Sequence, residues 1–93
     1  MYQKIYNSRF RKSIKKIVRS GRISREEIEL FIDNIAAGKP FEQQHEDHAL
    51  IGEWLSFREC HIKPDLLLIY KIEKNILILL LADIGSHSNL FGK

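Results

Sequence analysis

The chain has 93 residues, 44% hydrophobic and 29% charged, which fits one globular domain (residues 1–93) and excludes a disordered chain. A lone cysteine excludes an internal disulfide, and the longest apolar run is far shorter than a membrane helix of roughly 20 residues. We therefore expect a cytoplasmic protein without membrane contact. The net charge of +3 is unevenly distributed, because residues 1–25 carry nine basic and no acidic side chains. Such a segment is either a solvated helix face or an attractor of polyanions such as nucleic acid.

The first part of the chain predicts a short strand and two helices. Residues 1–6 alternate loosely, which favours a strand. Apolar residues then recur at helical spacing among basic ones, up to a helix end at Gly21. These apolar residues are Phe10, Ile14, Ile17 and Val18. A second helix is predicted to begin at a capping box, residues 24–27, and to stop at Gly38. The short connection makes the two helices antiparallel.

The remainder predicts a long polar loop followed by three strands. The loop covers residues 38–52, and the strands cover residues 54–62, 66–72 and 76–84. Short turns between these strands demand antiparallel neighbours, and the apolar run of the last strand indicates burial on both faces. The predicted fold is α+β, in the order β-α-α-β-β-β. An antiparallel sheet carries an N-terminal helical hairpin packed on one face.

Histidine is the residue type that points to chemistry here, because its side chain gives and takes protons near neutral pH. Four histidines on a basic protein suggest proton transfer on a phosphodiester. Cleavage of RNA by its own 2′-hydroxyl needs a base, an acid and positive charge at the phosphorus. It needs no metal, because the nucleophile belongs to the substrate. The candidates are His48, His61, His87 and Asp65 for proton transfer, with Arg58 and Lys63 for positive charge.

Structural interpretations compete with this chemistry. A single surface histidine is more often a bystander than a catalyst. Residues 45–48 read His-Glu-Asp-His, which is not H-E-x-x-H, so no metal and no cofactor is predicted. Cys60 has no adjacent base and is expected in the core. Ser86 and Ser88 lack the G-x-S-x-G sequence of a nucleophile elbow.

Three sequence blocks carry a family resemblance. They are D-H-A-L-I-G-E-W at residues 47–54, F-R-E-C-H-I-K-P-D-L-L-L-I-Y at residues 57–70, and G-S-H-S-N-L-F at residues 85–91. Together they resemble the YafQ branch of the RelE/ParE toxin superfamily. Residues 1–46 are similar to that branch only in element order and basic character.

The resemblance implies the toxin of a type II toxin–antitoxin pair, an endoribonuclease (mRNA interferase) that cleaves translated mRNA on the ribosome and inhibits growth. Its implied partners are a cognate antitoxin, the ribosome and mRNA, with operator DNA contacted only through the antitoxin complex. The catalytic residues that carry over are His48, His61, Asp65 and His87, and Phe91 matches an aromatic residue near the RNA. We expect His87 to be the leading general acid. Asp65 is expected to act with His61 or His48 in orienting or activating the 2′-hydroxyl.

The basic first helix fits this interpretation. Its side chains would meet ribosomal RNA phosphates in a salt-sensitive manner, or an acidic antitoxin segment. The residues concerned are Lys12, Lys15, Lys16 and Arg19.

The chain departs from the resemblance at two positions. Some relatives place an arginine where this chain has Asp83, so charge on the phosphorane would have to come from Arg58, Lys63 or another basic residue. Leu66 stands where relatives can carry an aromatic residue. Two alternatives remain, a non-cleaving ParE-like gyrase inhibitor and a decayed toxin that acts as an RNA- or DNA-binding module.

Overall fold

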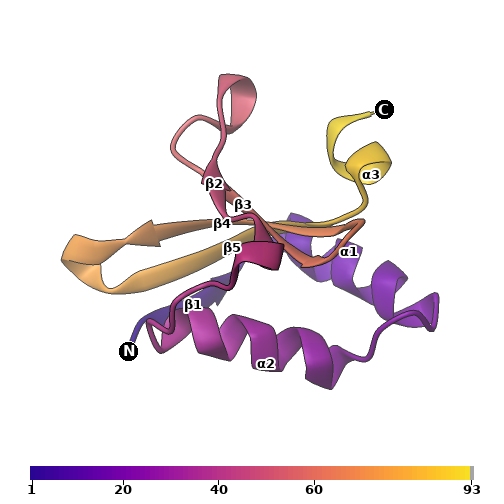
Figure 1. The fold of residues 1–93 in the computed structure, drawn as a ribbon, viewed down its shortest axis with the longest axis horizontal. Coiled ribbons are helices and arrows are strands. Elements are labelled where there is room, and N and C mark those ends of the chain that lie inside the picture. Colours follow the sequence, from indigo (N-terminus) through magenta and orange to yellow (C-terminus); the bar gives the residue numbers. More distant parts are fainter. Residues whose placement is uncertain (93) are drawn as a thin grey trace.

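The structure is a computed structural model that describes residues 1–92. A five-stranded sheet carries two long helices on one side and a short helix on the other (Figure 1). The elements are β1 Gln3–Tyr6, α1 Ser8–Arg19, α2 Arg25–Ala36, β2 His48–Ala49, β3 Arg58–Lys63, β4 Leu66–Glu73, β5 Ile78–Gly85 and α3 His87–Phe91. Single turns of 3-10 helix lie at Gln43–His45, Gly52–Trp54 and Lys74–Ile76. No helix within residues 1–92 is long and apolar enough to span a membrane.

The predicted fold class is confirmed, with one difference in the sheet. The strand order is β1-β5-β4-β3-β2, and β2 to β5 pair antiparallel as the short turns require. β1, however, pairs parallel with β5, so the sheet is mixed. The reason is that no tight turn joins β1 to a neighbour, so its direction is set by the helical hairpin that follows it.

Three further differences concern the ends of elements. The strand predicted from residue 54 begins at Arg58, because residues 52–54 form a 3-10 turn instead. The segment predicted as a long loop contains the two-residue strand β2, and the last sequence block forms helix α3. α3 begins at Ser86, whose side chain accepts a hydrogen bond from the Asn89 backbone N–H at 3.1 Å.

The two long helices begin where cap residues accept backbone hydrogen bonds. The side chain of Asn7 accepts from the Phe10 N–H at 2.8 Å, and Ser24 accepts from the Glu27 N–H at 3.1 Å. Only half of the predicted capping box is therefore present, because the Glu27 carboxylate lies 3.4 Å from Lys63 Nζ instead. Gly21 ends the first helical segment with a φ of 80°, as predicted.

The core has two layers because both faces of the central strands are buried. On the hairpin side, α1 and α2 pack against every second residue of β4 and β5, including Leu68 and Leu81. On the opposite face, Leu67 and Ile69 pack with Leu90 of α3 and with aromatic side chains of the segment between β2 and β3. Burial on both faces explains the continuous apolar sequence of these strands.

Cys60 lies in the hairpin-side core and is completely buried, as predicted. Burial raises the pKa of its thiol far above the usual range, so the thiol stays protonated and unreactive.

Candidate active site

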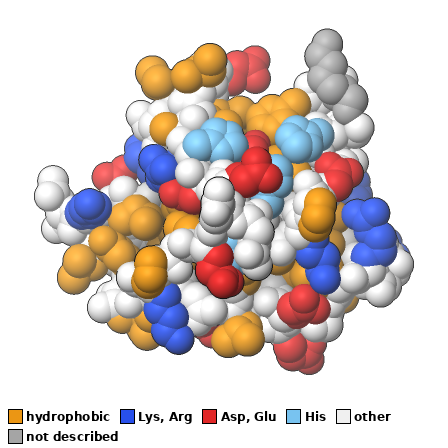
Figure 2. Space-filling model, in the orientation of Figure 1, with side chains coloured by type: hydrophobic (Ala, Val, Ile, Leu, Met, Phe, Trp, Pro, Cys, Tyr) orange, Lys and Arg blue, Asp and Glu red, His pale blue; other side chains and the backbone are white. Residues whose placement is uncertain are grey.

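Strand β3 places two ionisable side chains on the sheet face that is turned away from the helical hairpin. Glu59 lies opposite Ile69 of β4, and His61 lies opposite Leu67. Residues paired directly across strands share a face, so both side chains project beside the smaller core layer under α3. His48 of β2 is in turn paired with Glu59. Figure 2 shows histidine side chains gathered on one rim of the molecule with acidic groups among them.

Glu59 is the central group of this cluster. The residue is only 4% exposed, and its Oε1 lies 3.4 Å from His48 Nε2 and 3.5 Å from His61 Nε2. A buried carboxylate is costly unless hydrogen-bond donors or positive charge compensate it, and here two imidazoles do so. Sequence reasoning missed Glu59. The signal for it was the spacing of Glu59 and His61, because residues i and i+2 of a strand point to the same side.

The two ring nitrogens of His48 have different partners. Nδ1 is 2.7 Å from the carbonyl oxygen of Glu46, which can only accept, so Nδ1 carries a hydrogen. Nε2 faces the carboxylate of Glu59, another acceptor. His48 therefore has one ring nitrogen against a backbone carbonyl and the other against the Glu59 carboxylate.

The β3–β4 turn holds His87 at the first turn of α3. Asp65 Oδ1 accepts a hydrogen bond from the His87 backbone N–H at 3.2 Å and lies 3.3 Å from its ring Nδ1. These two contacts, the backbone one first, lower the pKa of the Asp65 carboxyl, so it stays ionised at neutral pH. With Nδ1 directed at Asp65, Nε2 is the nitrogen of His87 that can meet a substrate.

The His87 ring completes the cluster. Its centroid is 5.9 Å from that of His61 and 6.1 Å from that of Phe91, which stands on the other side of it in α3. The structure thus brings the four predicted catalytic residues to one surface. It pairs Asp65 with His87, however, and not with His61 or His48, because the β3–β4 turn lies against the start of α3.

The two cations predicted to supply positive charge are engaged elsewhere. Arg58 makes a bidentate pair with Asp47, with Nη2 at 2.7 Å from Oδ2, and this hydrogen bonding raises the pKa of the guanidinium. The Tyr70 hydroxyl also donates to Asp47. Burial, followed by this bond, raises the Tyr70 pKa far above its usual range. Lys63 pairs with Glu27 of α2. Neither cation joins the histidine cluster.

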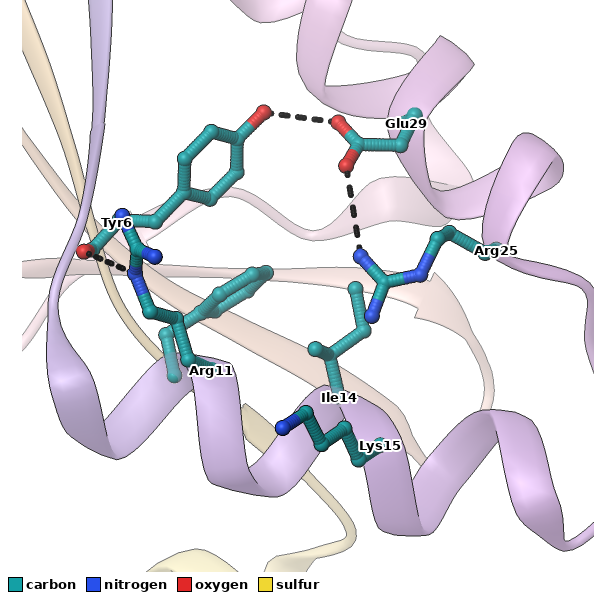
Figure 3. A pocket seen from close by; sticks show the side chains of 7 residues that line it. Tyr6, Arg11, Ile14, Lys15, Arg25 and Glu29 are labelled. Atoms are coloured by element: carbon teal, nitrogen blue, oxygen red, sulfur yellow. Dashed lines mark hydrogen bonds and ion pairs between the residues drawn. The ribbon is translucent and has the colours of Figure 1, made fainter.

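The basic residues predicted on α1 are all on its exposed surface. They are Lys12, Lys15, Lys16 and Arg19. Lys15 lies at the edge of a cavity of about 270 Å³ between α1 and α2 (Figure 3). There Glu29 accepts a hydrogen bond from the Tyr6 hydroxyl at 2.7 Å and meets Arg25 Nη1 at 3.8 Å. The Tyr6 bond joins α2 to β1, and no histidine lines this cavity.

His45 is structural, unlike the other three histidines. Its Nδ1 accepts a hydrogen bond from the Glu42 backbone N–H at 3.1 Å, and its ring packs edge-on against Phe31 at 4.9 Å. His45 and His48 therefore do not form the metal pair that residues 45–48 could have suggested. Within the described part of the chain, the group with metal-ligand geometry is Glu59, His61 and His87, whose ligand atoms all lie within 4.8 Å of one another.

The pairing of Asp65 with His87 gives a first prediction. Asp65→Asn is expected to lower the rate of RNA cleavage about tenfold, because an ionised hydrogen-bond partner of the imidazole is lost. Single-turnover kinetics at saturating and at low RNA check this, because a positioning residue changes the rate constant and leaves the affinity for RNA unchanged. Asp65→Glu, which restores the charge, should recover most of the rate. Equal loss in both variants would contradict a positioning role.

Comparison with known proteins gives the relatives of the whole chain. Residues 2–92 match the family described as "Bacterial toxin of type II toxin-antitoxin system, YafQ". An mRNA interferase toxin YafQ of Escherichia coli K12 is 38% identical over 53 residues, which are 57% of this chain and 55% of that protein. The matched segments span about half or less of the length of the curated relatives.

Solved structures match almost the entire chain. A metal-bound toxin from Helicobacter pylori has a TM-score of 0.88 and 38% identity, covering 98% of this chain and 100% of that one. YafQ in the DinJ–YafQ complex of E. coli has a TM-score of 0.81 and 26% identity, covering 99% of this chain and 100% of that one. Taken with the match over residues 2–92, these likenesses show that the chain belongs to the YafQ family of bacterial type II toxin–antitoxin toxins.

Proposed function

We propose that this chain is an mRNA interferase, the toxin of a type II pair, which cleaves mRNA during translation on the ribosome and so arrests growth. The observation that carries the proposal is the buried carboxylate of Glu59 between His48 and His61, with the His87 ring 5.9 Å from that of His61. The name of the E. coli relative supports the same activity. The reaction is attack of a 2′-hydroxyl on the adjacent phosphate, giving a 2′,3′-cyclic phosphate and a free 5′-hydroxyl.

The first proton transfer removes hydrogen from the 2′-hydroxyl. Glu59 is suited to this role because its carboxylate is fixed by two imidazoles on a rigid strand and has no competing backbone partner among the described residues. The oxygen–phosphorus bond forms as the hydroxyl hydrogen passes to the carboxylate. A positioned base or acid of this kind contributes about 10²–10⁴ in rate.

The second proton transfer protonates the departing 5′-oxygen as its bond to phosphorus breaks. His87 is the acid that the geometry favours, because Asp65 occupies its Nδ1 and orients the ring, while Nε2 remains to meet the 5′-oxygen. Phe91 packs beside the ring and offers a flat apolar surface to the base of the substrate.

Negative charge develops on the phosphate oxygens between these two steps. His48 and His61 flank Glu59 at 3.4 and 3.5 Å, so this charge develops beside two polar imidazole rings that stabilise it electrostatically. This assigns to imidazoles the role that the sequence had suggested for Arg58 and Lys63, both of which pair with carboxylates elsewhere.

The same cluster fits a transition-metal ion. Two imidazoles and one carboxylate, from Glu59, His61 and His87, are ligands that suit zinc or copper, and the similar H. pylori toxin is described as metal-bound. A metal held there would neutralise Glu59 and occupy nitrogens that otherwise move protons. The cleavage steps above use only groups of this chain and of the RNA.

The partners follow from the charge distribution. We assign the exposed basic face of α1, which carries nothing acidic, to RNA phosphates of the ribosome. The E. coli relative forms a complex with the antitoxin DinJ, and we propose a cognate antitoxin for this chain as well. Contact with operator DNA would occur only through that toxin–antitoxin complex. A toxin that acts on the ribosome would work in the cytoplasm, and we propose that location.

Induced expression in a bacterium tests the function. Growth should arrest, and mapping of 5′ ends should find new RNA ends within translated reading frames. Purified protein should cleave an mRNA bound to ribosomes. Growth arrest without new RNA ends, together with inhibited gyrase, would replace the proposal by a gyrase inhibitor. RNA binding without cleavage would leave a binding module.

A further inference from the structure

A second polar cavity, of about 490 Å³, lies between α1 and the junction of β5 with α3. Three basic residues line it, Arg9 and Lys16 from α1 and Arg22 from the turn after that helix. Asn89 of α3, two residues after His87, also lines it. α1 lies on the hairpin side of the sheet and α3 on the opposite side, so the cavity is bounded by elements from both faces (Figure 1). The cavity is therefore lined by positive charge and hydrogen-bond donors, which suits an anion.

A buried carboxylate holds Arg9 in place. Asp83 is 3% exposed, and its Oδ2 lies 3.0 Å from Arg9 Nε. The same carboxylate accepts from the Ser13 hydroxyl at 2.6 Å and from the Ile84 N–H at 2.8 Å, which fixes its orientation. The Arg9 guanidinium also lies over the Trp54 ring, 5.4 Å from its centroid. Because the carboxylate meets Nε, the terminal nitrogens can donate to a ligand.

The charge balance of the cavity remains positive. Asp83 compensates one cation, whereas neither Lys16 nor Arg22 forms an ion pair with a carboxylate among residues 1–92. A preformed cationic cavity of this kind binds a phosphate with little reorganisation, because Arg9 is already ordered by its two contacts.

The cavity adjoins the histidine cluster at two points. Asn89 lies two residues after His87 in α3, and Arg22 also lines a neighbouring cavity that contains Asp65. Asp65 bonds to His87. An RNA strand whose scissile phosphate meets His87 can therefore place a flanking phosphate among the three cations.

We propose that this α1–α3 cavity is a subsite for a backbone phosphate of single-stranded RNA that flanks the scissile phosphate. The inference rests on the proposed function for where the RNA strand runs, because that function puts the scissile phosphate at His87. Binding of a phosphate in the cavity does not depend on cleavage. The subsite gives the buried Asp83 a role beside an anionic substrate, since Asp83 orders the arginine that meets the phosphate.

Binding of a non-cleavable RNA tests the subsite. The probe is a fluorescently labelled single-stranded RNA with methylated 2′-oxygens, and its Kd is measured over a range of salt concentrations. Each phosphate contact with a single strand contributes about 0.7 to the slope of log Kd against log salt, or about fivefold in affinity per tenfold change in salt. Arg9→Gln, Lys16→Gln and Arg22→Gln should each weaken binding and lower that slope, and the three losses together should correspond to one phosphate contact.

Lys74→Gln is the matched control, because it removes the same charge from an exposed turn between β4 and β5. It should bind the probe as the wild type does. Lys16→Gln keeps the test independent of folding, since Lys16 holds no ion pair that its loss could break. Wild-type affinity and slope in all three variants, with wild-type cleavage, would overturn the subsite and leave the ribonuclease intact. If the three variants bind the probe more weakly than the wild type but the wild type cleaves no RNA, the ribonuclease proposal would be overturned and the subsite would stand. Variants that lose purified antitoxin but keep RNA would assign the cavity to the protein partner.

Discussion

His87→Gln is expected to lower the rate of RNA cleavage about 10²–10⁴-fold, the contribution of a positioned general acid. Glutamine keeps a polar side chain of similar reach, but its amide cannot give up a proton at neutral pH. The 5′-oxygen would then leave without protonation. Single-turnover cleavage of a ribosome-bound mRNA, measured under identical conditions for both proteins, checks the expected loss.

His45→Gln is the matched control for that measurement. It makes the same substitution at a histidine whose ring nitrogen is bonded to the Glu42 N–H and which lies outside the cluster. It should cleave at the wild-type rate. The His87 side chain is 54% exposed, so His87→Gln is expected to fold, and circular dichroism checks the folding of both variants. Wild-type cleavage by a folded His87→Gln protein would contradict the assignment of the general acid.

The sequence predicted the fold well because local signals there agree with the tertiary structure. Helical spacing, cap residues and short turns each act within a few residues, and they located both long helices and three strands. β1 was misjudged in direction because its partner, β5, lies more than 70 residues away. The last block predicted no helix, because five residues carry too few turns for a periodic pattern.

The candidate site was predicted in its residues but not in its pairings. His48, His61, Asp65 and His87 come to one surface, but Asp65 contacts His87 and not His61 or His48, and Glu59 was not among the predicted residues. A buried carboxylate between two histidines depends on the pairing of β2 with β3, and the sequence indicated no β2 strand. Arg58 and Lys63 looked available because the carboxylates that bind them are 11 and 36 residues away in the chain.

Asp83 is a second position whose role in the structure could not be predicted from the sequence. In the sequence it removed one candidate cation, because some relatives place an arginine there. In the structure Asp83 is buried against α1 and holds Arg9, so a guanidinium from 74 residues earlier stands at this position and lines the proposed phosphate subsite. The charge of a residue read from the sequence therefore does not give the charge of the surface that the residue builds.

Glu59→Gln is expected to lower the single-turnover cleavage rate about 10²–10⁴-fold, as for loss of a general base. The substitution keeps the shape of the side chain, and its amide oxygen can still accept from His48 and His61. Removal of a negative charge beside the phosphate should leave the affinity for RNA unchanged or tighter. A rate that falls while binding is retained distinguishes a base from a residue that only supports the fold.

Glu53→Gln removes the same charge from an exposed position in the turn Gly52–Trp54 and should cleave normally. If Glu59→Gln also cleaved at the wild-type rate, the base would have to be an imidazole, and His61 would be the one to replace next. Its side chain is 11% exposed and has Glu59 on one side and the His87 ring on the other. Glu59→Gln and the replacement of His61 together therefore decide whether the carboxylate acts on the RNA directly or only through the histidine beside it.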